Sequence, residues 1–278
     1  MPRVSAIVTT RNSGRTLRAC LESLRAQTER PEIVVVDNGS TDETPALAAQ
    51  LADVVMHAGP ERSAQRNVGI RAASGEFVLI VDSDMILEPG VVAACLRTAG
   101  EGAGAIAIPE ESFGSGYWAQ CKRLERSAYA NDALVQAARF FRRADLLEIG
   151  GYDEDLHGGE DWDVSLRASA LSGFAVADAL IRHDEGVVRL GVLFRKKLYY
   201  ARSLRRFVRK HGGEALRRLS PLRGSLIANI PAMLRKPHLF AGVVVMKSVE
   251  LAGVLCGLAL RQGTVRTSLY SANEGRRA

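Results

Sequence analysis

The chain has 278 residues, 47% of them hydrophobic and 24% charged, which suits one large α/β domain with an appendage or two small domains. This balance excludes a disordered chain and allows a core that needs no disulfide. The net charge of +6 is uneven, because residues 189–218 hold eleven Lys or Arg and one acid, so any partner that this charge implies belongs to the C-terminal third.

Apolar strands and amphipathic helices alternate along the first 108 residues. Strands are predicted over 4–10, 32–36, 53–56, 77–81 and 103–108. Helices are predicted from Ser13 to about Gln27, from Asp42 to about Leu51, from Arg62 to Ala73 and from Pro89 to about Thr98, with Ser13 and Asp42 as caps. This alternation predicts an α/β fold with a mostly parallel sheet and helices on both faces.

The second part of the chain is less regular. It reads as a helix over 115–129, a strand near 137–142, a Gly- and acid-rich loop leading into a helix that ends near 171, and a strand over 174–177. After His183 the composition changes to basic helices. We therefore divide the chain near residue 188, into a domain of residues 1–187 and an extension of residues 188–278.

Two carboxylates one residue apart, Asp82 and Asp84, can hold a divalent cation that bridges a diphosphate. The same spacing occurs at 153/155 and 161/163, but only the first pair follows a continuous apolar run. It therefore falls at the carboxyl end of a central strand, where open α/β sheets bind ligands. The alternative is a helix-capping turn before Pro89.

Asp37 and Thr9 end two other predicted strands. An acid at that place commonly contacts a nucleoside, and Thr9 would line the same crevice. The alternative for Asp37 is an Asx turn with the Asn-Gly that follows. Arg62 and Arg66 are one helical turn apart and match phosphate geometry, although composition alone favours a solvated helix face.

Glu160 and Asp161 begin a helix after the glycine pair 158–159, which would let a substrate approach the backbone. One of these acids is a candidate general base for an acceptor hydroxyl, and simple capping of the helix is the alternative. His183 follows the last predicted strand and is either a metal ligand or a structural histidine.

Together these segments resemble family 2 glycosyltransferases, which have the GT-A fold, over residues 4–186. The resemblance rests on an ordered set: SAIVTTRN (5–12), IVVVDNGSTD (33–42), RNVG (66–69), DSD (82–84), GGYD (150–153) and EDWD (160–163). It implies transfer of a sugar from a nucleotide diphosphate donor to an acceptor hydroxyl by a single inverting displacement.

By this resemblance, Thr9 and Asp37 bind the nucleoside and Arg66 lies near the donor. Asp84 and Asp82 would coordinate Mg²⁺ or Mn²⁺ on the diphosphate, and His183 matches a late histidine that some relatives use near the metal.

The resemblance further implies that Asp161 is the base and that Glu160, beside it, contacts the acceptor or donor sugar. Transfer to a polyprenyl phosphate is the first alternative, but a phosphate acceptor is already anionic and needs no base. A non-catalytic membrane-bound scaffold is the second. A nucleotidyltransferase is disfavoured by the single glycine after the first strand, and a Rossmann oxidoreductase by the lack of Gly-x-Gly-x-x-Gly.

Four scattered cysteines without metal-ligand spacing favour buried free thiols in a reducing compartment. Residues 1–3 run into a strand without a secretory signal, so we expect a cytoplasmic protein. We expect no nucleic acid partner.

Two C-terminal segments predict a place on the inner face of the membrane. Residues 189–218 are basic and amphipathic, which suits an anionic surface or a face packed on the catalytic domain. Residues 239–260 are nearly long enough to span a bilayer, but Lys247 and Glu250 are costly in hydrocarbon and can pair with each other. We therefore expect an interfacial helix, with a packed core helix as the alternative, and a lipid-linked or cell-surface glycan as the acceptor.

Overall fold

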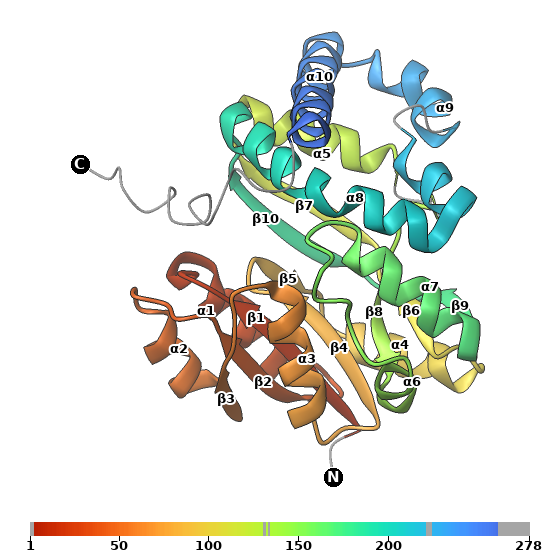
Figure 1. The fold of residues 1–278 in the computed structure, drawn as a ribbon. Coiled ribbons are helices and arrows are strands. Elements are labelled where there is room, and N and C mark those ends of the chain that lie inside the picture. The colour runs from red at the N-terminus through yellow and green to blue at the C-terminus, as the bar shows by residue number, and fades with distance from the viewer. Residues whose placement is uncertain (1–2, 130–131, 133, 221–223, 261–278) are drawn as a thin grey trace.

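A seven-stranded sheet forms the centre of the protein (Figure 1). The computed structural model describes residues 3–129, 132, 134–220 and 224–260. In spatial order the strands are β3 (Val54–His57), β2 (Glu32–Asp37), β1 (Val4–Thr10), β4 (Phe77–Asp82), β8 (Ala138–Arg142), β6 (Ala105–Ala107) and β9 (Phe174–Val176). Only β8 runs antiparallel to its neighbours, so the predicted mostly parallel sheet is confirmed.

Helices cover both faces of this sheet. They are α1 (Gly14–Arg25), α2 (Thr44–Leu51), α3 (Arg62–Ala72), α4 (Val91–Gly100), α6 (Arg143–Glu148) and α7 (Glu160–Ser172). Ala6 and Val8 of β1 face the core formed with α1, α2 and α4, whereas Ile7 faces the core formed with α3, α6 and α7. Burial on both faces explains why the central strands are continuous apolar runs.

A second sheet of three strands was not predicted. It comprises β5 (Met85–Leu87), β10 (Ile181–Val187) and β7 (Glu110–Ser115), in that order. The two longer strands are rich in charged and small residues, so they lack the apolar pattern from which strands are predicted. Their pairing follows from contacts between distant segments.

Several helix starts differ from the prediction. Ser13 stands at the cap position of α1 without a side-chain cap bond. Glu43, and not Asp42 as predicted, stands at the cap position of α2, while Asp42 accepts the backbone N–H groups of Thr44 and Gly14. Helix α4 begins after Pro89 and Gly90, because Gly90 is left-handed with φ of 86°. Helix α5 (Tyr117–Ser127) begins two residues later than predicted, after strand β7.

The C-terminal helices are α8 (Leu190–Leu219), α9 (Gly224–Met233) and α10 (Pro237–Ala259). Non-helical backbone at Gly212 interrupts α8. Helices α8 and α10 lie with α5 on the side of the second sheet away from the central sheet (Figure 1). Among the described helices, α10 alone is long and apolar enough to cross a membrane, by length and composition only. The boundary near residue 188 falls between β10 and α8 and stays a prediction.

Candidate active site

The carboxyl ends of β1, β2 and β4 meet at one edge of the central sheet. The pairing register sets Thr9 beside Asp82, and Thr10 beside Asp37. Buried Gln65 of α3 donates from its amide nitrogen to the backbone oxygens of Thr10 and Val36, which holds β1 and β2 together at this edge. Three residues predicted from separate motifs therefore share one edge.

The Asp37 carboxylate is buried and takes part in a turn. It accepts hydrogen bonds from the Ser40 backbone N–H, at 2.9 Å, and from the Ser40 hydroxyl. His57 Nδ1 lies 3.9 Å from Asp37 Oδ2. Asp37 thus stabilises the turn after β2, and its contact with a nucleoside remains a prediction.

Arg66 joins the two acidic motifs. Its guanidinium is fully buried and lies 3.0 Å from Asp82 Oδ1, 2.7 Å from Asp161 Oδ1 and 3.6 Å from Glu160 Oε1. The same group lies over the Tyr152 ring, with Cζ 5.0 Å from the ring centroid. A buried arginine needs such partners, because an unpaired charge is very costly in a low-dielectric interior.

A second arginine, Arg139 of β8, was not predicted, and its side chain is 12% exposed. Its Nε donates to Glu110 Oε1 at 2.6 Å, and its Nη2 lies 3.5 Å from Asp82 Oδ2. Burial acts to raise the pKa of Asp82, but Arg66 and Arg139 outweigh it and hold that pKa well below its usual range. Asp82, predicted as a metal ligand, is therefore an ionised acid between two arginines.

Asp84 and His183 come together through the second sheet. Met85 pairs with His183 across the antiparallel β5–β10 ladder, and His183 Nε2 lies 3.3 Å from Asp84 Oδ2. The other ring nitrogen, Nδ1, lies 3.3 Å from Glu110 Oε2. Burial acts to lower the pKa of His183, but the hydrogen bonds with Asp84 and Glu110 outweigh it and raise the pKa to about 9.

Several buried polar atoms at this edge have no hydrogen-bond partner among the described residues. They are Thr10 Oγ1, Arg66 Nε, Asp84 Oδ1, Arg139 Nη1 and the Tyr152 hydroxyl. Buried polar groups are normally satisfied, and exceptions that gather in one place are typical of a ligand site. Two are arginine donors and one is a carboxylate oxygen, so the site has capacity for both an anion and a cation.

Glu160 and Asp161 lie in the first turn of α7 but differ in exposure. The Glu160 side chain is 6% exposed and lies 3.0 Å from Arg62 Nη2, whereas the Asp161 side chain is 32% exposed. Burial, and then the neighbouring Asp161 charge, raise the pKa of Glu160 despite its arginine partners. Asp161 is thus the acid that an incoming molecule can reach.

Helix α8 packs directly against the glycine pair 158–159 before α7. The expectation that a substrate approaches the backbone there is therefore wrong. A Cβ at Gly158 would lie 2.6 Å from Tyr200 Cβ, and one at Gly159 would lie 3.3 Å from the Phe207 ring. Tyr200 also accepts a hydrogen bond from Arg62 at 2.9 Å. Helix α8 therefore forms one wall beside Glu160.

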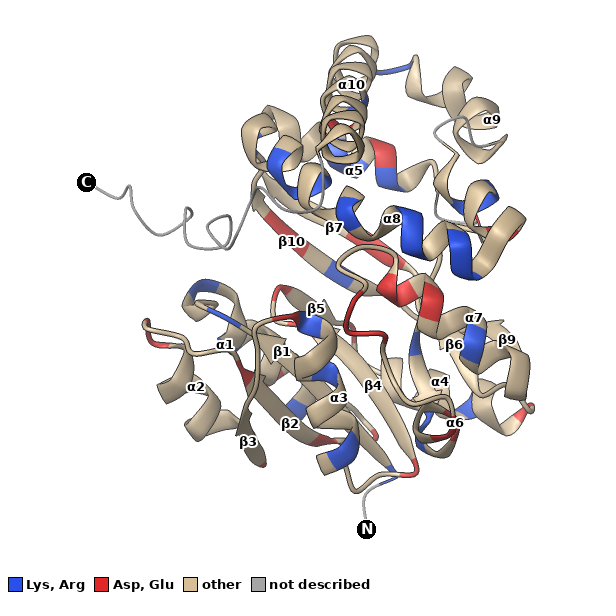
Figure 2. Ribbon diagram, viewed as in Figure 1, with Lys and Arg blue, Asp and Glu red and all other residues tan. Residues whose placement is uncertain are grey.

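Part of the basic surface of α8 is paired with the acidic loop, as Figure 2 shows where the blue segments of α8 face the red start of α7. Lys210 Nζ lies 2.7 Å from Asp163 Oδ1, which also lies 2.8 Å from His211 Nε2. Arg206 and Lys210 both contact Asp153 at 3.1 Å. These basic residues of α8 therefore pack on the catalytic domain, which is one of the two alternatives given for residues 189–218.

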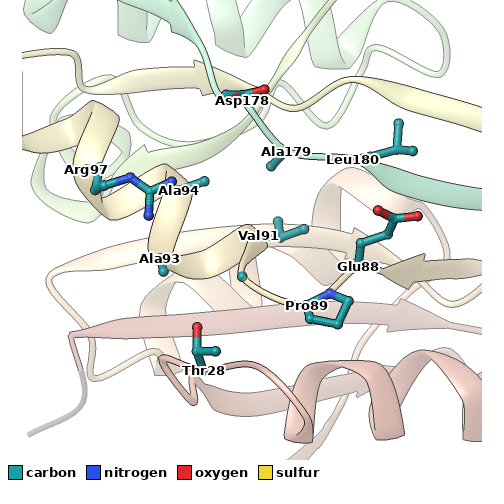
Figure 3. Close-up of a pocket in the computed structure, with 11 residues that line it drawn as sticks. Thr28, Glu88, Pro89, Val91, Ala93, Ala94, Arg97, Asp178, Ala179 and Leu180 are labelled. Atoms are coloured by element: carbon teal, nitrogen blue, oxygen red, sulfur yellow. The ribbon is translucent and has the colours of Figure 1, made fainter.

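A hollow of about 510 Å³ lies elsewhere, between the start of α4 and residues 178–180 (Figure 3). Thr28, Glu88, Arg97 and Asp178 are among its lining residues, and no predicted site residue is. No group of three or more His, Cys, Asp or Glu side chains is arranged as a metal site within the described residues. The edge at Asp82 and Asp84 therefore remains the candidate site on chemistry and geometry.

The fold and the site together define an α/β protein with polar side chains gathered at the carboxyl edge of a parallel sheet, the edge at which such sheets bind ligands. The model of the family described as glycosyl transferase family 2 matches residues 5–149. The chain belongs to this family, and the resemblance seen in its motifs is confirmed.

Individual relatives agree with this assignment. EpsH of Bacillus subtilis is 41% identical over 107 residues, covering 36% of this chain and 31% of EpsH. YwdF of Bacillus subtilis, an uncharacterised glycosyltransferase, is 29% identical over 182 residues, covering 60% of this chain and 68% of YwdF. The chain thus spans about a third of the first relative and two thirds of the second.

A solved structure has the same fold. It is the mannosyltransferase PcManGT from Pyrobaculum calidifontis in complex with GDP-Man and Mn²⁺. The TM-score is 0.63 at 20% identity, and the match covers 93% of this chain and 87% of that one. The GT-A fold expected from the sequence is confirmed.

Proposed function

We propose that this protein is an inverting glycosyltransferase that moves a sugar from a metal-bound nucleotide diphosphate to an acceptor hydroxyl. The observation that carries the proposal is buried Arg66, which lies 3.0 Å from Asp82 on the donor side and 2.7 Å from Asp161 on the acceptor side. One guanidinium thereby fixes the donor-side acid relative to the acceptor-side acid, as a displacement between two bound substrates requires.

In this proposal Asp84 and His183 hold Mg²⁺ or Mn²⁺, a fit supported by the unpartnered buried Asp84 Oδ1 and by His183 Nε2 at 3.3 Å from Asp84 Oδ2. When bound, such a cation neutralises charge on the departing diphosphate. Asp82 keeps Arg66 and Arg139 in place beside it. Thr9 and Asp37 line the nucleoside end of the crevice.

Asp161 takes the proton from the acceptor hydroxyl in this mechanism. The hydroxyl oxygen then bonds to the anomeric carbon from the face opposite the diphosphate. The bond between the anomeric carbon and the diphosphate oxygen breaks, and the nucleoside diphosphate leaves. Asp161 suits the role better than Glu160, because it is more exposed, while Glu160 is buried against Arg62. Glu160 instead orients Arg62 and the wall made by Tyr200.

Donor binding is tested by a thermal-shift panel of UDP, GDP, dTDP and CMP sugars with and without Mn²⁺. One nucleotide sugar is expected to raise the melting temperature, since a ligand at 100 times its Kd stabilises the native state by about 2.7 kcal/mol. Asp84→Asn should weaken Mn²⁺ binding, because the site loses a charged ligand. The Mn²⁺ concentration that gives half of the metal-dependent melting shift should rise at least about tenfold. A matched Asp155→Asn variant, in an exposed carboxylate, should behave as wild type. The proposal fails if no donor shifts the transition and none is hydrolysed.

Arg139 is the proposed donor-binding residue that sequence reasoning missed. Its Nη1 is buried and has no partner among the described residues, while its other nitrogens contact Asp82 and Glu110. Arg139→Gln should raise the donor KM by about 10-fold or more, since a hydrogen bond to a charged group contributes about 1.5–3 kcal/mol. Steady-state kinetics and calorimetric donor binding measure this, with urea unfolding to check stability. An unchanged donor affinity would remove Arg139 from the site.

We also propose that the protein works on the inner face of the membrane, bound peripherally, and that the acceptor is a lipid-linked or cell-surface glycan. The basic and apolar composition of the C-terminal helices supports this.

A further inference from the structure

The outer face of α10 is an apolar stripe. Exposed residues recur along it at helical spacing: Ala241, Val244, Val245, Ser248, Leu251, Ala252, Leu255, Cys256 and Ala259. Ser248 is the one polar member, and its hydroxyl donates to the Val244 carbonyl. From 241 to 259 the stripe is about 27 Å long at 1.5 Å per residue. Water-exposed apolar faces of this extent mark interaction surfaces.

The charged residues of α10 point away from the stripe. Lys247 and Glu250 pair at 3.1 Å, as predicted, and both also contact residues of other helices. Glu250 lies 3.6 Å from Lys122 of α5 and 3.8 Å from Lys197 of α8, and Lys247 contacts Glu125 of α5. These five groups satisfy one another inside the helical layer. Helix α10 would lose these partners on crossing a bilayer alone, so it stays packed on α5 and α8.

Cationic side chains flank the stripe at both ends, and the described residues between 190 and 260 include only two acids. Glu250 is buried, and Glu214 pairs with Arg218. Exposed Arg235 and Lys236 precede α10 at one end of the stripe, and Arg205 reaches the Leu258 carbonyl at the other. Cations at both ends suit anionic headgroups, while a second copy of the chain would bring like charges together.

From this we infer that α10 lies flat in the surface of an anionic bilayer, with the stripe of residues 241–259 among the acyl chains and the flanking cations at the headgroups. Helix α8 separates this surface from the candidate site. Its Leu198 and Ala201 pack on Gly257 of α10, and its Tyr200 contacts Arg62 beside Glu160. The stripe and the site are thus separated by α10 and α8, about two helix diameters or on the order of 20 Å. Given the proposed function, this fits an acceptor carried on a lipid.

Co-sedimentation of the full chain with vesicles tests this surface. Binding to phosphatidylcholine vesicles with a quarter of phosphatidylglycerol is expected to exceed binding to phosphatidylcholine alone and to fall with salt. The pair Leu251→Glu and Leu255→Glu should lower the partition coefficient at least about tenfold, because two leucines leave the hydrocarbon. Leu171→Glu, at a leucine of matched 47% exposure on α7, should bind as wild type. Equal binding by the stripe variant would overturn the inference.

Cys256 offers a direct probe of the same stripe. It is exposed, contrary to the expectation of buried thiols, whereas Cys20, Cys95 and Cys121 are buried. An environment-sensitive dye on Cys256 should shift to the blue with anionic vesicles and be quenched by nitroxide lipids. A dye on Leu171→Cys in a Cys256→Ser background should not respond.

Three further results would reject the proposal: an unchanged Cys256 spectrum, resistance to carbonate extraction as for a spanning helix, or a dimer that the stripe variant dissociates. Donor binding measured without lipid reports separately on the proposed enzymatic function.

Discussion

Asp161→Asn is expected to lower sugar transfer by about 10²–10⁴-fold, the usual loss when a general base is removed. The change keeps the shape of the side chain but cannot take a proton from the acceptor. Arg66 retains Asp82 and Glu160 as ionic partners in this variant, so the fold and the donor site should persist. Single-turnover rates and calorimetric donor binding measure the two effects separately.

Two controls make this result specific. Asp155→Asn removes an acid from the loop before α7 that is 74% exposed and faces Arg206, and it should leave turnover near wild type. Glu160→Gln should act mainly through Arg62, with a smaller loss of turnover. Near-normal turnover in Asp161→Asn would assign the base elsewhere, and turnover lost only in Glu160→Gln would assign it to Glu160.

Arg66→Ala is expected to produce the largest loss of stability, about 3–5 kcal/mol in the free energy of unfolding, because breaking a buried ion pair leaves its partners uncompensated. Here the partners are buried Glu160 and the partly buried Asp82 and Asp161. Arg66→Lys keeps the charge but loses the planar fork that reaches two acids at once, so an intermediate loss is expected. Urea unfolding followed by fluorescence measures both variants.

A surface arginine provides the control for Arg66→Ala. Arg18 of α1 lies 3.5 Å from Glu22, and both side chains are about half exposed. Exposed pairs of this kind contribute about 0–1 kcal/mol, so Arg18→Ala should change the midpoint little. Equal stability of Arg66→Ala and Arg18→Ala would show that the guanidinium does not hold the acids together.

The parallel part of the sheet was predictable because its signal is local. Residues 4–10, 32–37 and 77–82 are apolar runs that end in polar residues, and strand direction then sets Thr9, Asp37 and Asp82 at one edge. Helix periodicity likewise located α1 and α3, and with α3 the buried Arg66. The pairing of Lys247 with Glu250 follows from their spacing on one helix.

The other half of the site depends on which distant strands pair. Strand β8 runs antiparallel to β4, so its beginning, with Arg139, lies beside the end of β4, with Asp82. Strand β10 pairs with β5 and thereby brings His183 to Asp84. The direction of neither strand can be predicted from its local sequence. Side chains alternate between the two faces of a sheet in the same way in parallel and in antiparallel strands.

By itself, the sequence determined the family, through its resemblance to an ordered set of family motifs. It also determined the parallel core and the acids at its carboxyl edge, because these arise from periodicity along the chain. Only the tertiary structure decided that Tyr200 fills the space at Gly158, that α8 pairs with the acidic loop, and that the charges of α10 face inward. The reason is that side-chain burial and ion pairing are satisfied by partners far away in sequence, and their positions exist only after the helices have packed.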